Sequence, residues 1–198
     1  MLALIALAAQ LMQSIGAQRS TVDFFSYFTI QSNLIAVGVL LWVALKPVKG
    51  PGPLSRDLIR GAPVLYLTIT GVVFFLLLSD LPLVTVPFAN TVLHKLMPVV
   101  MVADWLIDPP SEALSFRQAT AWLIYPLAWL GYTMLRGPLV GWYPYPFLNP
   151  AVAGGYGAVL FSILLILLGG LFFIWLLVWL GRKARQWISK PSAVDYAD

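Results

Sequence analysis

Two groups of polar side chains lie within long apolar runs of this chain, and the spacing of each group predicts one face of a helix. At helical steps of about 100° per residue, Ser26, Thr29 and Asn33 fall in one narrow stripe. Asn90 and His94 share a second stripe, and His94 is the only histidine in the chain. A neutral imidazole can take the proton of a hydroxyl group within hydrogen-bond reach, which makes that oxygen nucleophilic.

The same residue types also have ordinary structural roles. A threonine in a membrane helix most often bonds to a backbone carbonyl one turn earlier. A single histidine in a membrane is often a hydrogen-bond partner between helices. Polar side chains in lipid usually face protein or a water-filled cavity. Spacing alone therefore leaves a structural and a chemical interpretation open.

The helices that carry these residues are expected to cross a membrane. Of the 198 residues, 60% are hydrophobic and 10% are charged, against roughly a quarter charged in a soluble domain. The mean hydropathy is +0.86. A soluble domain of this size cannot bury so much apolar surface. The composition excludes a soluble enzyme, a disordered tail and a typical nucleic-acid binder.

Six apolar runs approach the roughly 20 residues that a membrane-spanning helix needs. They predict an all-α fold, a polytopic membrane helix bundle with six transmembrane helices in one domain, residues 1–180. A short basic cytoplasmic tail follows at 181–198. The spans are expected at about 1–15, 24–45, 58–79, 88–108, 117–136 and 156–180. Ser115 and Gln118 have capping-box spacing, which can start the fifth run. The first run lacks the positive start of a signal peptide, which favours a retained helix.

Lys and Arg residues give the bundle a direction. With six spans, nine of them fall on one side, namely Lys46, Lys49, Arg56, Arg60, Arg117, Arg182, Lys183, Arg185 and Lys190. The other side has Arg19 and Arg136, and Lys95 lies within a span. Positive residues accumulate on the cytoplasmic side, so both termini are expected to be cytoplasmic. The net charge of +4 is then an orientation signal and implies no nucleic-acid partner.

This orientation places the two polar stripes at one depth. The second and fourth runs both start at the outer surface, and Thr29 and His94 lie about five or six residues in. At 1.5 Å per residue, each is ~8–9 Å below the outer boundary. We therefore expect an outer cavity bounded by these two helices and roofed by the loop at 137–150.

Three motifs resemble those of a known family. The segment FFSYFTIQSNL at 24–34 resembles the signature of the bacterial six-span membrane family called Pr6Pr. LHKLMP at 93–98, followed by Asp104-Trp105, is similar to its second landmark, and Arg136-Gly137 with YPYPFLN at 143–149 to its third. The similarity covers residues from about 5 to 180.

The resemblance implies an enzymatic activity. The bacterial family is similar to the animal androgen-induced protein family, membrane threonine hydrolases that cleave fatty acid esters of hydroxy fatty acids. It implies Thr29 as the nucleophile and His94 as the base, and the Tyr-Pro-Phe element of those proteins resembles Tyr145-Pro146-Phe147. Candidates for binding the substrate or its oxyanion are then Ser26, Asn33, Arg136 and Tyr145. A carboxylate of the substrate could pair with Arg136.

The implied protein lies in the bacterial inner membrane, with its polar site towards the outer side. Its partners are the bilayer and a lipid or fatty-acid ester substrate. We expect no cofactor. We also expect no metal, because one histidine and no cysteine leave only scattered carboxylates as ligands. The alternative is a non-catalytic lipid-binding, transport or scaffold membrane protein that uses the same polar pocket.

Overall fold

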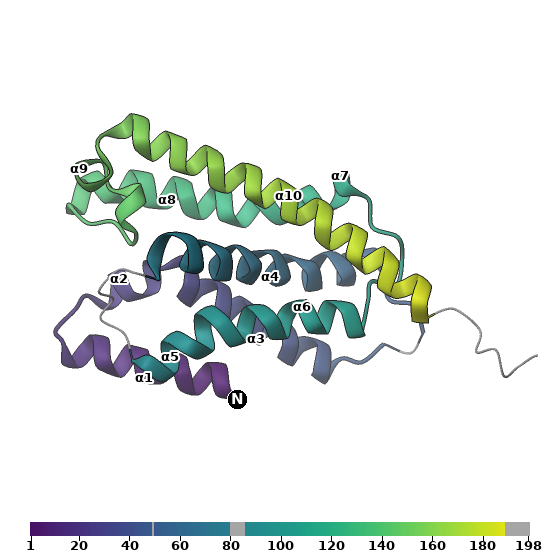
Figure 1. Cartoon of the computed structure of the whole chain (residues 1–198). Coiled ribbons are helices and arrows are strands. Elements are labelled where there is room, and N and C mark those ends of the chain that lie inside the picture. Colours follow the sequence, from purple (N-terminus) through teal and green to yellow (C-terminus); the bar gives the residue numbers. More distant parts are fainter. Residues whose placement is uncertain (49, 80–85, 189–198) are drawn as a thin grey trace, which may run out of the picture.

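The computed structural model describes residues 1–48, 50–79 and 86–188, and within these ranges every regular element is a helix (Figure 1). The all-α class is therefore confirmed for the described part of the chain. The elements are α1 (Leu2–Gly16), α2 (Thr21–Ser26), α3 (Phe28–Leu45), α4 (Leu54–Val73), η1 (Phe74–Leu78), α5 (Pro87–Thr91), η2 (Val92–Leu96), α6 (Met97–Ile107), α7 (Phe116–Ala119), η3 (Thr120–Leu123), α8 (Ile124–Val140), η4 (Pro146–Leu148), α9 (Pro150–Ala153) and α10 (Tyr156–Ile188).

Three helices among the described residues are long and apolar enough to cross a membrane. They are Phe28–Leu45, Leu54–Leu78 and Tyr156–Ile188. The other three expected runs are shorter or divided, since α1 has 15 residues and the remaining two each combine several helical elements. Six spans therefore remain a prediction.

The last helix runs past the expected end at 180 to Ile188. Lys49, Lys190 and the tail from 189 to 198 lie outside the described residues.

The second expected run is interrupted near its start. Ser20 caps α2 by accepting a hydrogen bond from the backbone N–H of Asp23 at 3.3 Å. Tyr27 then adopts an extended backbone and α3 starts at Phe28. This break makes Thr29 the second residue of a new helix. The predicted capping box at Ser115 and Gln118 is confirmed, and it starts α7.

Two π-helical segments, η1 and η2, interrupt the third and fourth runs. Pro98 follows η2 and has no N–H to donate to the carbonyl of His94, four residues earlier, so a regular α-helical bond cannot form there. A β-carbon at Gly71 would lie 3.3 Å from the carbonyl oxygen of His94 and 3.1 Å from Pro98. Glycine at 71 thus lets α4 approach this segment closely. Short π-helical segments often occur at functional sites.

Helix α4 is the centre of the bundle, and α3, α6 and α10 each pack against it (Figure 1). A β-carbon at Gly61 of α4 would overlap the indole of Trp122, which donates to the carbonyl of Leu58 at 2.9 Å. The indole of Trp105 donates to the carbonyl of Leu177 at 3.0 Å, which joins α6 to α10. These contacts fix η3 against α4 and α6 against α10.

Charged residues join helices near the end where α6 finishes. The buried Arg60 of α4 pairs with Asp108 at 2.8 Å and with Asp104 at 3.5 Å. Asp104 and Asp108 thus have a structural partner, and they lie towards the end of α6 away from His94.

Candidate active site

A cavity of about 550 Å³ lies at the end of the bundle where α3 begins. We call it the polar cavity. Both Thr29 and His94 line it, together with residues of α1, α2 and the loop before η4, including Gln10, Gln13, Asp23, Trp142 and Tyr145. The cavity expected between the second and fourth runs, under the 137–150 loop, is therefore present in the structure.

The hydroxyl of Thr29 faces a tyrosine. The phenol oxygen of Tyr145 accepts a hydrogen bond from the Thr29 backbone N–H at 3.2 Å and lies 3.3 Å from Thr29 Oγ1. The hydroxyls of Ser26, Thr68 and Ser162 instead donate to backbone carbonyls four residues earlier. Since α3 starts only at Phe28, Thr29 has no complete helical turn before it. The Thr29 hydroxyl therefore forms its hydrogen bond with a residue outside α3, namely Tyr145.

The ring of His94 is held in one orientation. Nδ1 of His94 lies 3.2 Å from the carbonyl oxygen of Asn90. A carbonyl can only accept, so Nδ1 carries the proton and Nε2 is the basic nitrogen. The ring of Phe74 stacks on the imidazole with centroids 4.3 Å apart. Thr29 and His94 make no direct hydrogen bond, so proton transfer between them needs a movement of the side chains or bridging water.

Tyr145 is suited to donate a hydrogen bond at neutral pH. It lies in the loop between α8 and η4 and is 8% exposed. Burial raises the pKa of the Tyr145 phenol to about 12. The phenol therefore stays protonated, and its oxygen already accepts from a backbone N–H at the start of α3. Both effects leave its proton for an acceptor near Thr29.

Two of the expected oxyanion donors have other partners. The amide of Asn33 donates to the carbonyl of Thr29 at 2.9 Å and to the carbonyl of Leu93 at 3.2 Å. It therefore ties α3 to η2. The hydroxyl of Ser26 donates to the carbonyl of Val22 and lies 2.8 Å from the phenol of Tyr132. Neither side chain lines the polar cavity.

Arg136 also has partners within the fold. Its guanidinium pairs with the carboxylate of Asp23 and lies over the ring of Trp142, 5.4 Å from the ring centroid. Arg136 does not line the polar cavity, whereas Arg19 does. Arg136 thus holds α2 and the Trp142 loop together beside the cavity, and Arg19 is the arginine in the cavity wall.

Helix α8 holds the junction of α2 and α3 through one stripe of side chains. Tyr125 donates to Gln31, the indole of Trp129 donates to the carbonyl of Ser26 at 2.9 Å, and Tyr132 and Arg136 continue the series. Their spacing of four, three and four residues is that of one helix face. This periodicity is visible in the sequence. It does not show which helix the stripe faces, so it does not predict the partners of these side chains.

The structure adds a further residue to the candidate site. Asn90 lines the polar cavity one helical turn from His94, and its side-chain oxygen is buried without a hydrogen-bond partner. The shared stripe with His94 indicated its position but not its role. Among the described residues no group of three or more His, Asp or Glu side chains is arranged to hold a metal ion.

No protein-family profile, curated protein or solved structure matches this chain. What the site can do is therefore inferred from its own geometry. A hydroxyl, an imidazole and a protonated phenol line one cavity, and this set can carry out acyl transfer through a covalent intermediate.

Proposed function

We propose that this protein is an intramembrane hydrolase of lipid esters, with Thr29 as nucleophile and His94 as base. The proposal includes membership of the Pr6Pr family, six spans, cytoplasmic termini and a site facing the outer side of a bacterial inner membrane. The substrates are fatty acid esters of hydroxy fatty acids or similar esters. Support comes from the motifs, from the charge distribution and from the cavity shared by the two residues.

The reaction begins with attack of Thr29 Oγ1 on the ester carbonyl carbon. His94 Nε2 takes the hydroxyl proton, directly or through one water. The phenol of Tyr145 donates to the oxyanion that develops on the carbonyl oxygen. The C–O bond of the ester then breaks, and His94 returns the proton to the leaving alcohol. Water attacks the acyl-threonine with His94 as base, which releases the fatty acid and restores Thr29.

The observation that carries the proposal is the state of the Thr29 hydroxyl. Thr29 is 5% exposed, yet its hydroxyl makes no bond to a preceding carbonyl and lies 3.3 Å from the Tyr145 phenol oxygen, in a cavity that His94 also lines. The helix hydroxyls of Thr68 and Ser162 instead bond back to their own helices. The geometry thus favours the chemical interpretation of Thr29 over the structural one.

The test is covalent labelling and ester turnover by the purified protein in lipid nanodiscs. We expect a fluorophosphonate probe to label the wild-type protein, and hydrolysis of long-chain 4-nitrophenyl esters. Thr29→Ala and His94→Ala should abolish both, while Thr29→Ser should retain part of the activity. Thr68→Ala is the matched control, since its hydroxyl bonds to the carbonyl of Val64 and Thr68 does not line the polar cavity.

Two results would overturn the hydrolase proposal. One is a folded wild-type protein with neither labelling nor turnover. The other is activity that survives in Thr29→Ala and His94→Ala alike. Lipid binding without turnover would support the non-catalytic alternative, a lipid-binding or transport protein that uses the same polar cavity.

A further inference from the structure

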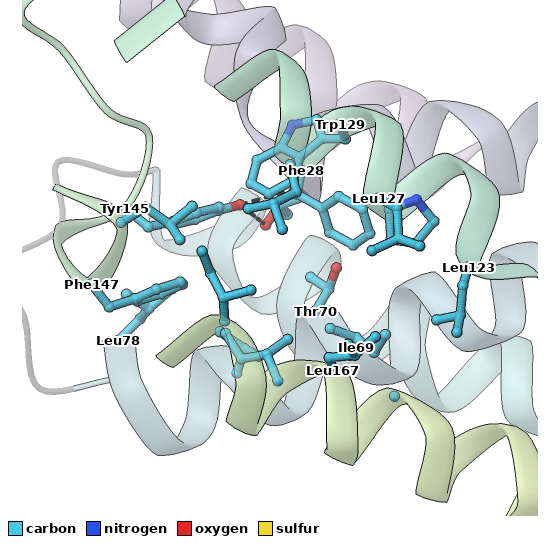
Figure 2. A pocket seen from close by; sticks show the side chains of 18 residues that line it. Phe28, Ile69, Thr70, Leu78, Leu123, Leu127, Trp129, Tyr145, Phe147 and Leu167 are labelled. Atoms are coloured by element: carbon cyan, nitrogen blue, oxygen red, sulfur yellow. Dashed lines mark hydrogen bonds between the residues drawn. The ribbon is translucent and has the colours of Figure 1, made fainter. Parts of the chain in front are cut away.

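A second cavity shares the Thr29–Tyr145 contact with the polar cavity. We call it the apolar chamber, of about 110 Å³, between α4, α8 and α10 (Figure 2). Thr29, Leu78 and Tyr145 line both cavities. A molecule whose carbonyl group reaches Thr29 can therefore extend one part into each cavity.

The apolar chamber is elongated along the helices that form it. One wall runs from Leu123 to Leu130 along η3 and α8, and another from Ile163 to Gly170 along α10. Each wall has residues at positions i, i+3, i+4 and i+7, the spacing of one helix face. Seven residues span about 10 Å of an α-helix. Figure 2 shows Tyr145 and Phe147 at one end and Leu123 at the other, so the chamber leads away from the Thr29–Tyr145 contact along the bundle.

The two cavities differ in the chemistry of their walls. The residues that line the apolar chamber are apolar apart from Thr29, Thr70, Trp129 and Tyr145, and the chamber borders the surface expected to face lipid, since Leu127 is 48% exposed. The wall of the polar cavity instead has amide, hydroxyl and charged side chains, among them Gln10, Gln13, Arg19, Asp23 and Asn90. A hydrocarbon chain therefore fits the first cavity, and a hydrated or charged group fits the second.

The position of His94 decides which half of an ester enters which cavity. His94 lines the polar cavity and does not line the apolar chamber. In the proposed hydrolysis it returns a proton to the leaving alcohol and then takes a proton from the attacking water. Both steps require the alcohol, and later the water, on the side of His94. The acyl chain stays bonded to Thr29 between these steps, so it has to lie on the other side, in the apolar chamber.

The charges around the polar cavity favour an alcohol half that carries a negative group. Arg19 and Asp23 are the charged residues in its wall. The carboxylate of Asp23 is already paired with Arg136. In the described ranges of the chain, the ion pairs involve Arg60 and Arg136 but not Arg19. The guanidinium of Arg19 can therefore pair with a carboxylate of the substrate.

We propose that an ester binds across the Thr29–Tyr145 contact in one direction, with its acyl chain in the apolar chamber and its alcohol half in the polar cavity. A carboxylate on the alcohol half then lies towards Arg19. This inference rests on the proposed hydrolase function and adds which cavity selects which half of the substrate. The preferred substrate is an ester between a long hydrocarbon acyl chain and an alcohol that carries a carboxylate.

Two neighbouring glycines test the selection of the acyl half. Gly170 lines the apolar chamber, and a β-carbon there would make only ordinary contacts, whereas Gly169 does not line it and has open space around it. Purified protein in nanodiscs is given 4-nitrophenyl esters of butanoic and hexadecanoic acid, which differ only in the acyl half. Gly170→Leu should lower the ratio of kcat/KM for the long ester to that for the short ester about tenfold, and Gly170→Ala should lower it less. Gly169→Leu should keep the wild-type ratio.

Arg19 tests the selection of the alcohol half. The substrates are the hexadecanoyl ester of a hydroxyoctadecanoic acid and the methyl ester of the same compound, which lacks the free carboxylate. The wild-type protein should prefer the free acid, and Arg19→Gln should reduce this preference about tenfold. Arg19→Lys should retain part of the preference. The acyl-length ratio should stay unchanged in Arg19→Gln, since the two halves are selected by different cavities.

A binding measurement separates this proposal from the hydrolase proposal, because it needs no turnover. A photoreactive hexadecanoic acid with a diazirine in the middle of its chain is cross-linked to the protein in nanodiscs, and the labelled peptides are identified by mass spectrometry. We expect labelling of the faces of α8 and α10 that line the apolar chamber. Excess hexadecanoic acid should compete with it, and it should be weaker in Gly170→Leu but not in Gly169→Leu. This result supports the acyl site even where no ester is hydrolysed.

Other outcomes overturn the proposed direction of binding while leaving the hydrolase proposal intact. One is Thr29-dependent hydrolysis with the wild-type acyl-length ratio in both Gly170→Leu and Gly170→Ala. Another is an acyl-length ratio that changes in Arg19→Gln, which would place the acyl chain in the polar cavity. Cross-linking that hexadecanoic acid does not compete with overturns the acyl site without any reference to turnover. Equal hydrolysis of the free acid and its methyl ester by the wild-type protein overturns the role of Arg19.

Discussion

Buried polar side chains in this protein differ in whether the fold completes their hydrogen bonds. Asn33 and Ser32 are neighbours on α3 and both are 0% exposed. Asn33 donates to two carbonyls, whereas the hydroxyl of Ser32 has no partner. Thr29 is a third kind, because its hydroxyl meets the Tyr145 phenol beside the polar cavity. The role of each residue therefore follows from its partners more than from its burial.

Substitution of Asn33 should destabilise the protein much more than substitution of Ser32. Asn33→Ala leaves the carbonyl of Leu93 without its partner and loosens the link between α3 and η2. We expect a cost of about 1–3 kcal/mol in the free energy of unfolding. Ser32→Ala removes a hydroxyl that makes no bond and should cost little. Thermal unfolding followed by tryptophan fluorescence measures both, and equal losses would contradict the assigned role of Asn33.

Removal of the Tyr145 hydroxyl should slow the chemical step and leave binding nearly unchanged. Tyr145→Phe keeps the ring that stacks on Phe147, with centroids 5.3 Å apart. It removes the donor next to Thr29 Oγ1. Loss of one oxyanion donor lowers kcat by about one hundredfold in other hydrolases. Steady-state kinetics should show this fall in kcat with little change in KM. A rise in KM at constant kcat would instead assign Tyr145 to substrate binding.

At the scale of whole elements, close approach between helices depends on a few small residues. Gly61 allows the indole of Trp122 to lie against α4, and Gly71 allows α4 to approach the segment that carries His94. The stripe from Tyr125 to Arg136 holds α8 against the junction of α2 and α3. The two halves of the candidate site are thus positioned by contacts outside it.

A matched pair of glycines tests this dependence. Gly61→Ala places a methyl group inside the Trp122 ring, and such overpacking costs about 1–3 kcal/mol. Gly131 lies within α8 with open space around it, so Gly131→Ala should be neutral or stabilising by up to about 1 kcal/mol. Melting temperatures in one detergent compare the two. A Gly61→Ala variant as stable as Gly131→Ala would show that the Trp122 contact is adaptable.

At the scale of the molecule, the sequence predicted which end of the bundle holds the candidate site. Counting residues from the ends of the apolar runs brought Thr29 and His94 to one level, and both line the polar cavity. It did not predict the partners of Asn33 and Arg136. Each depends on which neighbouring helix faces the residue. Asp23 and Arg136 are 113 residues apart in the sequence. Helical periodicity predicts which residues share a face of one helix, but it does not predict which residues of two distant helices meet.

The orientation of the molecule decides which side of the membrane the polar cavity faces, and single cysteines can test it because the chain has none of its own. Val152 of α9 is 65% exposed and follows the loop that lines the cavity. Lys183 belongs to the basic end of α10.

In intact spheroplasts we expect a membrane-impermeant maleimide to label Val152→Cys at once, and Lys183→Cys only after the membrane is permeabilised. The reverse pattern would place the cavity on the cytoplasmic side. Labelling of both positions from outside would require an even number of spans between them and would contradict the positive-inside assignment on which six spans depend.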